Sequence, residues 1–326
     1  MTDECITRNF NVLSSNGAGN RSSIIADNTD AKGCPGGGVV VGGGGGAATA
    51  AGAPPVVANK LVARMPVDRY ASEYNMNHKN RGVALIFNHE FFDIPSLKSR
   101  SGTNVDSAEL KLALEGLGFS VSVHKDCKLL DILKYVEKAA SQDHTDNDCL
   151  AVAILSHGEH GYLYAKDTQY KLDNIWHYFT ANFCPTLAGK PKLFFIQACQ
   201  GDRLDGGMTL EKSTTETDGD SSMSYKIPIH SDFLFSYSTI PGYYSWRNIN
   251  NGSWFMQSLI RELNTNGKKY DILTLLTFVN QRVAIDFESN VPGTPMMDRQ
   301  KQIPCLTSML TRILRFSDKP NGNKAG

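Results

Sequence analysis

The sequence predicts an α/β fold, a three-layer sandwich in which a mostly parallel sheet of six strands carries helices on both faces. Six short apolar runs recur along the chain, and segments with a helical spacing of apolar residues separate most of them. The runs are nearly continuous in hydrophobicity, which is typical of strands buried on both faces. Ligands of such sheets bind beyond the carboxyl ends of the strands, so functional residues are expected there.

Four strands are predicted in the first half of the chain. Ordered structure is expected from about Lys79, with strands at 82–88, 119–123, 149–155 and 192–196. Helices are expected at 107–118, 129–140 and 173–182, and in the first two the apolar residues recur every three or four positions. Strands that alternate with helices are joined by crossovers, which favours parallel pairing.

The second half supplies the remaining strands. A strand is predicted at 233–238, a helix that opens at Ser253, a longer helix from Asp271 to about Phe287, and a last strand within 304–316. Residues 202–226, which precede these elements, are polar and acidic and show no apolar periodicity. We expect this stretch to be an exposed linker between two halves of one sheet.

The N-terminal segment and the composition limit the class of protein. Residues 1–60 contain a tract of mostly Gly, Ala, Val and Pro between Gly33 and Pro55, so a flexible low-complexity segment is expected. The 33 basic and 33 acidic side chains cancel, so no net charge attracts nucleic acid or an anionic membrane. With no secretory signal or membrane span predicted, we expect a soluble cytoplasmic protein without nucleic-acid or membrane partners.

The cysteines do not form a recognisable framework. There are seven, and no two have the spacing of a metal knuckle. A disulfide scaffold, a metal site and a cofactor are therefore not expected. Each cysteine has to be considered by itself.

Two of the predicted strand ends carry residues with catalytic chemistry. Cys199 follows the strand at 192–196, and His157 follows the strand at 149–155. A neutral thiol is a weak nucleophile, and an adjacent imidazole can stabilise or accept its proton and later protonate a leaving amine. The backbone amides of Gly158 and Cys199 could bind an oxyanion. A single cysteine or histidine at a strand end is more often structural, so the prediction depends on the pair.

The local sequence around this pair resembles the caspase family of cysteine proteases. QACQG around Cys199 fits the pattern by which caspases are recognised, with a histidine upstream. Further blocks follow in the order typical of caspases: SRSGTNVD, SHGEHG, GKPKLFFIQACQG, PGYYSWRN, GSWF and KQIPC. The resemblance covers residues 82 to about 316 and is strongest to effector caspases, in particular the insect death caspases.

This resemblance implies a caspase fold, cleavage after aspartate, and roles for further residues. Arg100, Gln197 and Arg247 would bind the aspartate side chain of the substrate, since guanidinium groups grip carboxylates in a fork geometry. Ser245 and Arg247 would pair with the substrate backbone as a β-strand. The side chains that would shape the remaining pockets are Tyr244, Trp246, Trp254 and, at an outer acid-preferring pocket, Asn248.

The resemblance also implies a zymogen that is activated by cleavage after aspartates and acts as an executioner in apoptosis. Cuts after Asp218 and Asp30 are expected, with Asp27 and Asp205 as weaker candidates. They would leave a large subunit at 61–218 and a small subunit at 219–326. The pair would dimerise through the last strand, between Leu306 and Phe316. Partners implied are proteins with exposed aspartate sites, an upstream activating caspase and inhibitor of apoptosis proteins.

Three alternatives remain open at this stage. A catalytically inactive caspase homologue could act as a regulatory binding partner, although such proteins usually lose the cysteine, the histidine or an arginine of the pocket. A zinc deaminase is suggested by His157-Gly158-Glu159, but its P-C-x-x-C partner motif is absent. An α/β binding protein would show no thiol-dependent hydrolysis.

Overall fold

The computed structural model describes residues 65–206, 228–248, 250–291 and 293–319, which belong to one compact unit at Ala58–Gly326. The predicted flexible segment at 1–60 lies outside the described residues, as do Asp27, Asp30 and Asp218. None of the helices in the described part is long and apolar enough to cross a bilayer.

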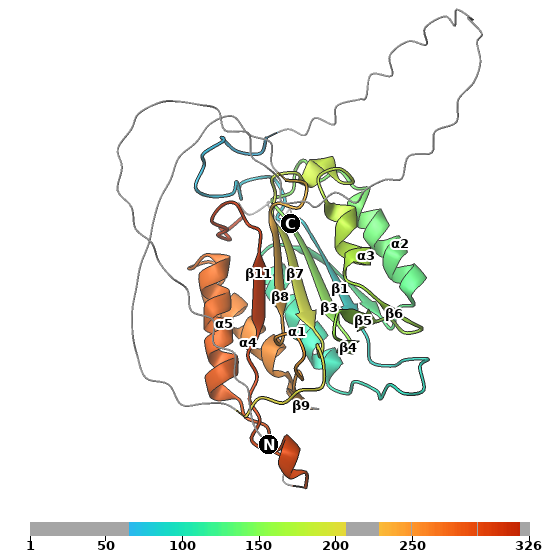
Figure 1. Cartoon of the computed structure of the whole chain (residues 1–326). Helices are drawn as coiled ribbons and strands as arrows, with labels where there is room; N and C mark the ends of the chain where they lie inside the picture. Colours follow the sequence, from blue (N-terminus) through green and yellow to red (C-terminus); the bar gives the residue numbers. More distant parts are fainter. Residues whose placement is uncertain (1–64, 207–227, 249, 292, 320–326) are drawn as a thin grey trace, which may run out of the picture. The chain divides into compact units, whose positions relative to one another are not determined.

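The central sheet has six strands in the order β11-β8-β7-β3-β1-β2 (Figure 1). Its strands are β1 (Val83–Asn88), β2 (Ser120–Lys125), β3 (Leu150–Leu155), β7 (Lys192–Gln197), β8 (Phe233–Tyr237) and β11 (Cys305–Ser308). The first five pair in parallel, and only β11 runs antiparallel to its neighbour β8. The predicted mostly parallel six-stranded sheet is confirmed.

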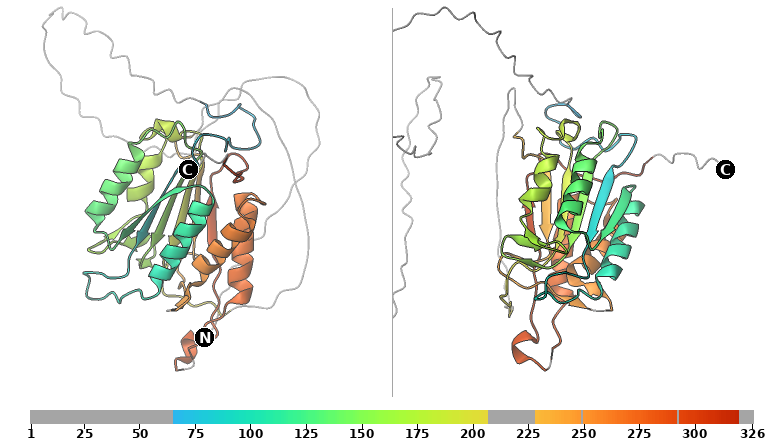
Figure 2. Two further views of the ribbon diagram at one scale, coloured as in Figure 1. Left: turned by 180° about the vertical axis from the view of Figure 1, so that it is seen from behind. Right: turned by 90° about the vertical axis from the view of Figure 1, so that its right-hand side faces the viewer.

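Helices cover both faces of this sheet, as Figure 2 shows from two further sides. One group consists of α1 (Thr103–Gly116), α4 (Trp254–Asn266) and α5 (Ile272–Asp286), and the other of α2 (Leu129–Ala140) and α3 (Asp173–Trp176). Each group buries its apolar side chains against one face, which creates two separate hydrophobic clusters. The start of α5 is fixed by Asp271, whose carboxylate accepts the amide hydrogens of Leu273 and Thr274.

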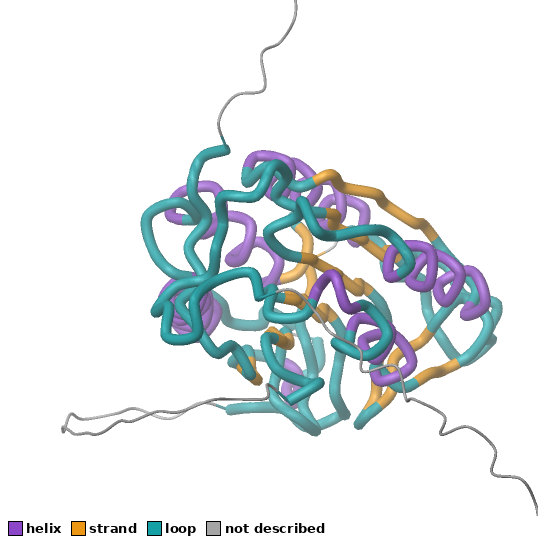
Figure 3. The backbone as a smooth tube through the Cα atoms, turned by 90° about the horizontal axis from the view of Figure 1, so that it is seen from above, coloured by secondary structure: helices purple, strands orange, loops and turns teal. Residues whose placement is uncertain are grey.

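Several elements differ from the prediction. The helix expected at 173–182 is only α3 followed by the 3-10 turn η1 (His177–Phe179), and the last strand ends at Ser308. Two further 3-10 turns are η2 (Pro185–Leu187) and η3 (Pro295–Met297). Two small sheets were not predicted because their strands have two or three residues: β4 (Gly158–Glu159), β5 (Tyr162–Tyr164) and β6 (Gln169–Tyr170) in one, β9 (Arg247–Asn248) and β10 (Gly252–Ser253) in the other. Loops connect these elements over long stretches (Figure 3).

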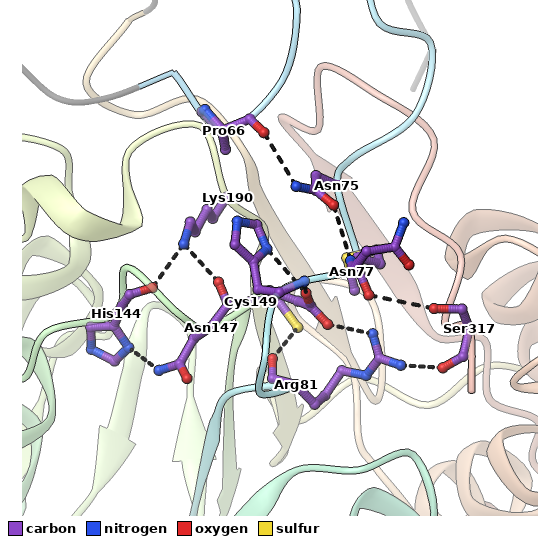
Figure 4. Close-up of polar contacts among 12 residues, drawn as sticks. Pro66, Asn75, Asn77, Arg81, His144, Asn147, Cys149, Lys190 and Ser317 are labelled. Atoms are coloured by element: carbon purple, nitrogen blue, oxygen red, sulfur yellow. Dashed lines mark hydrogen bonds and ion pairs between the residues drawn. The ribbon is translucent and has the colours of Figure 1, made fainter. Parts of the chain in front are cut away.

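The beginning and the end of the described chain are bound to each other. The amide of Tyr74 donates to the carbonyl of Ile313 at 3.0 Å. Beside this contact, the fully buried Asp148 accepts from Arg81 at 2.7 Å and forms a further ion pair with Lys319. Arg81 in turn donates to the carbonyl of Ser317 (Figure 4). These contacts, which we call the terminal clamp, join segments on opposite sides of the predicted linker.

Candidate active site

The parallel pairing of β3 and β7 brings the two predicted strand ends together. Leu155 is paired with Gln197, and His157 and Cys199 each lie two residues beyond this pair. Gly158 packs so closely on the neighbouring segment that a Cβ atom on it would lie 2.6 Å from the carbonyl oxygen of Cys199. The sheet therefore places the two catalytic candidates on touching loops.

The thiol of Cys199 is held by the backbone of Ser245. The Ser245 amide donates to Sγ at 3.4 Å, and Sγ lies 3.7 Å from the Ser245 carbonyl oxygen. Burial raises the pKa of the thiol, while the Ser245 contact and the charges of Arg100 and Arg247 oppose this rise. The thiol is therefore protonated at neutral pH.

His157 is oriented by a backbone carbonyl. Its Nε2 lies 2.7 Å from the carbonyl oxygen of Lys98, and its ring packs on Phe92 at 5.0 Å between centroids. A carbonyl oxygen only accepts hydrogen bonds, so Nε2 carries the proton and Nδ1 is the basic nitrogen. Burial lowers the pKa of His157, which keeps the ring neutral. Among the described residues, no hydrogen bond joins this ring to Cys199.

Arg100 and Gln197 converge beside the thiol with unsatisfied polar atoms. Arg100 is 1% exposed and uses Nη1 on the carbonyl of His89 at 2.9 Å and on Thr103 Oγ1 at 2.8 Å. Gln197 is 2% exposed and donates to Ser245 Oγ at 2.8 Å. Arg100 Nη2 and Gln197 Oε1 have no partner, although both are buried. Such atoms are rare in proteins and indicate a ligand site.

Arg247 completes the cationic group. Its Nε donates to the carbonyl of Ser101 at 2.9 Å, so the side chain reaches from β9 to the segment that carries Arg100. Burial, followed by the charge of Arg247, lowers the pKa of Arg100 to about 9. The two arginines thus lie close enough to act on each other, and both are still charged at pH 7.

The predicted aromatic residues Tyr244, Trp246 and Trp254 form a row that continues to Phe287, with the first pair tilted and the other two pairs stacked. Tyr244 lies 6.4 Å from Trp246, Trp246 lies 5.7 Å from Trp254, and Trp254 lies 5.4 Å from Phe287, measured between ring centroids. Trp246 and Phe287 are only partly buried, so the row borders the surface. The Oδ1 atom of Asn248 accepts the amides of Asn250 and Asn251 and is committed to the β9–β10 turn.

The segment that follows the nucleophile is paired with the loop before β9. The amides of Gln200 and Arg203 donate to the carbonyls of Tyr243 and Gly242, and the Arg203 guanidinium stacks on the Tyr243 ring at 4.7 Å. The pairing continues to Asp205, whose carbonyl oxygen accepts the Lys301 amide at 2.8 Å. The first residues of the predicted linker are therefore part of the folded site.

Four residues of this site were not among the predicted ones. Gln302 accepts the amide of Trp246 at 2.6 Å and donates to the carbonyl of Ser238, and Phe287 ends the aromatic row. Asp106 lies beside the arginine pair. Asp106 and Gln302 occur within the motif blocks and could have been suspected. Lys98 acts through its backbone, for which a sequence carries no signal. Among the residues that the structure describes, no cluster of His, Cys, Asp and Glu could hold a metal ion.

A partly buried thiol, an imidazole and two guanidinium groups thus lie together at the ends of parallel strands, an arrangement of the kind that cysteine peptidases use. Residues 81–315 match the model of the caspase domain family. The chain is 82% identical to "Caspase-1" of Drosophila melanogaster over the full length of both, and 72% identical to "Caspase drICE" of the same species over 80% of this chain and 77% of that one. The crystal structure of Caspase-1 from Spodoptera frugiperda is similar with a TM-score of 0.75 and 62% identity, over 80% of this chain and all of that one.

The chain therefore belongs to the caspase family and is a cysteine-type endopeptidase. The predicted function, a caspase of the executioner type, is confirmed by these relatives, and none of them supports the alternative of an inactive homologue. The family implies protein substrates and dimerising subunits.

Proposed function

We propose that this chain hydrolyses peptide bonds after aspartate with Cys199 as nucleophile and His157 as general base. The neutral states of both groups favour a transfer of the thiol proton to His157 Nδ1 while Sγ attacks the carbonyl carbon. The ring must turn toward the thiol, or the thiol must leave Ser245, for this step. The Lys98 carbonyl then stabilises the imidazolium through its bond to Nε2.

The remaining steps follow from the same groups. The amides of Gly158 and Cys199 bind the oxyanion, since they lie on the two touching loops. His157 gives its proton to the leaving amine, and the C–N bond breaks to leave a thioester on Cys199. A water molecule, deprotonated by the same imidazole, hydrolyses the thioester and restores the thiol.

The observation that carries the aspartate specificity is the pair of unsatisfied buried atoms next to the thiol. Arg100 Nη2 and Arg247 provide donors for a carboxylate. Gln197 contributes once its amide turns over, because Ser245 Oγ can then donate to its oxygen and its NH2 group faces the ligand. The pocket is buried at Arg100 and Gln197, so an unpaired neutral side chain would leave their donors unsatisfied.

The experiment is hydrolysis of a fluorogenic peptide with Asp before the reporter group, compared with the same peptide carrying Glu. We expect turnover with Asp, little with Glu, and loss of at least about a thousandfold in Cys199→Ala. Arg247→Ala should raise KM strongly, because it leaves the substrate carboxylate without one partner. Equal activity of the wild type and Cys199→Ala would refute the proposal.

The maturation of the chain belongs to the same proposal. Cuts after Asp218 and Asp30 would yield a large subunit up to residue 218 and a small subunit from residue 219, with an upstream caspase as activator. Inhibitor of apoptosis proteins would regulate the mature enzyme in the cytoplasm. Mass spectrometry of the matured protein tests the sites, and termini at other residues would discard them.

We further propose that two copies dimerise along β11. This strand pairs with β8 on one side only, and its free edge can add a second copy. The partly buried side chains Leu306 and Leu310 belong to the core beside it, while Met309 is exposed.

A further inference from the structure

A buried carboxylate lies beside the two arginines and takes no part in the proposed chemistry. Asp106 in α1 is 1% exposed. It accepts the amide of Ser253 at 2.9 and 3.1 Å and the Ser253 hydroxyl at 2.8 Å. Its oxygens are thus bound to one residue of β10, on the other side of the predicted linker.

The backbone of β10 is shaped to receive this carboxylate. Gly252 has a φ of 87°, and a Cβ atom there would lie 2.2 Å from Oδ1 of Asp106. A glycine is required for both reasons, since other residues rarely adopt this conformation and their Cβ would displace the carboxylate. The backbone at Gly252 is therefore matched in conformation and in size to the Asp106 carboxylate.

Ser253 connects the carboxylate to the substrate pocket. In the β9–β10 hairpin Ser253 is the direct partner of Arg247. Arg247 itself donates to the carbonyl of Ser101, five residues before Asp106 in the chain. The segments 101–106 and 247–253 are consequently joined at two points, Arg247 to Ser101 and Ser253 to Asp106.

The charge of Asp106 acts on both arginines. Burial raises the pKa of its carboxyl group to about 6, while the Ser253 hydrogen bonds and the charges of Arg100 and Arg247 oppose this rise. Among the described residues, Asp106 is the carboxylate whose negative charge raises the pKa of both Arg100 and Arg247, against the lowering by burial. Two adjacent cations repel each other before a substrate arrives, and a nearby anion offsets part of this repulsion.

We propose that Asp106 is a positioning residue of the aspartate pocket: through Ser253 and its charge it holds Arg247 against Arg100 at the distance that one short carboxylate bridges. This rests on the proposed cleavage after aspartate. It assigns a role in substrate specificity to Asp106 of α1. The carboxylate also ties the future large and small subunits together at the pocket.

The test compares Asp106→Asn with Asp232→Asn. Asp232 is a matched control, since it is equally buried and also links the two halves, accepting from Tyr74 at 2.7 Å, and it accepts from Thr311 of its own half at 2.6 Å. It directly precedes β8, at the opposite end of the sheet from Gln197. In Asp106→Asn we expect KM for the Asp peptide to rise about tenfold or more and kcat to change less than about threefold. The preference for Asp over Glu should fall, whereas Asp232→Asn should leave KM and preference unchanged.

Alkylation of Cys199 by iodoacetamide separates a change in the pocket from a change in the nucleophile. Its rate should be the same in Asp106→Asn and the wild type, because Asp106 does not contact the thiol. An unchanged or lower KM in a folded Asp106→Asn variant would overturn the inference. If the wild type itself shows no Cys199-dependent cleavage after Asp, the proposed function fails instead, so the two failures are distinguishable.

The wild type supplies a second measurement if the variant does not fold. Protonation of Asp106 removes the same charge, so KM should rise as the pH falls from 7.5 to 5. The charged groups that face Asp106 are Arg100 and Arg247, which stay protonated in this range, and the substrate carboxyl titrates lower. A KM that stays constant over this range would overturn the inference.

Discussion

At the residue scale, close backbone packing at Gly158 determines how the two catalytic loops meet. A Cβ atom at this position would lie 2.6 Å from the Cys199 carbonyl oxygen and 3.0 Å from the Ala198 Cβ. We therefore predict that Gly158→Ala separates the loops and lowers kcat at least about tenfold, since small displacements of reacting groups are costly. Steady-state kinetics measure this change.

The control is Gly116→Ala in α1, where the added Cβ atom meets free space and kcat should stay unchanged. Gly161→Ala would be a poor control because Gly161 has a φ of 81°, which strains an alanine. Wild-type kcat in Gly158→Ala would contradict the expectation.

Burial of His89 predicts a dependence of stability on pH. His89 is 0% exposed, its Nε2 donates to the carbonyl oxygen of Cys127 at 3.0 Å, and its pKa is lowered by burial to about 4. The unfolded chain, with an ordinary pKa near 6.5, binds protons more readily, so stability is complete above about pH 6.5 and falls as the pH drops toward 4. The expected loss at pH 5 is about 2 kcal/mol.

Urea denaturation at pH 7.5 and pH 5 measures this loss. In His89→Gln, which removes the titrating ring, the difference between the two pH values should shrink by about the same amount. A pH dependence equal to that of the wild type would show that other groups are responsible.

The proposed catalytic and pocket residues could be named from their motifs because each would act through its side chain. Cys199, His157 and Arg100 stand in blocks whose letters are specific. The contact of His157 with the Lys98 carbonyl could not be predicted from the sequence, since every residue has a backbone carbonyl. The hydrogen bonds between the Ser245 backbone and the Cys199 thiol could not be predicted either, because they depend on how a loop distant in the sequence folds back.

At the scale of elements, the terminal clamp is the feature with the largest predicted effect on stability. Asp148 is fully buried between Arg81 and Lys319. Asp148→Asn leaves these cations without their anion, and we expect the free energy of unfolding to fall by about 3–5 kcal/mol. Glu115→Gln, which breaks an exposed pair with Lys111, should cost under about 1 kcal/mol.

Urea denaturation measures both changes, first on the intact chain. After cleavage of the linker, the large and small subunits of Asp148→Asn should also separate at a lower urea concentration than those of the wild type. Equal stability of the two variants would show that the clamp does not hold the halves together.

Long apolar runs predicted the strands of the sheet well, whereas short or polar elements escaped prediction. The run at 149–155 is a fully buried strand, as expected. The helix expected at 173–182 ends early. Residues 177–179 form a 3-10 helix, and Thr180 adopts an extended conformation. The last strand ends at Ser308 because the chain then leaves the sheet edge and pairs with the segment near Tyr74.

At the scale of the whole molecule, the proposed dimer can be tested at the two edges of the sheet. β11 and β2 are the edge strands, and only β11 is proposed to pair with a second copy. Thr307→Lys places a charge on β11 and should raise the dimer dissociation constant at least about tenfold, because lysine disfavours edge pairing. Val123→Lys on β2 is the matched control and should leave assembly unchanged. Sedimentation velocity measures both, and a wild-type dimer in Thr307→Lys would reject this edge.

The pairing of Asp205 with Lys301 bears on where the chain can be cut. A protease that attacks the bond after Asp205 must polarise its carbonyl oxygen, yet that oxygen is already occupied by the Lys301 amide. Separating this segment from Lys301 would also remove the Arg203 guanidinium from the Tyr243 ring and disturb the pairing beside Cys199. The Lys301 hydrogen bond thus protects the peptide bond after Asp205, and after the proposed cut at Asp218 the residues up to Asp205 would remain paired with this part of the site.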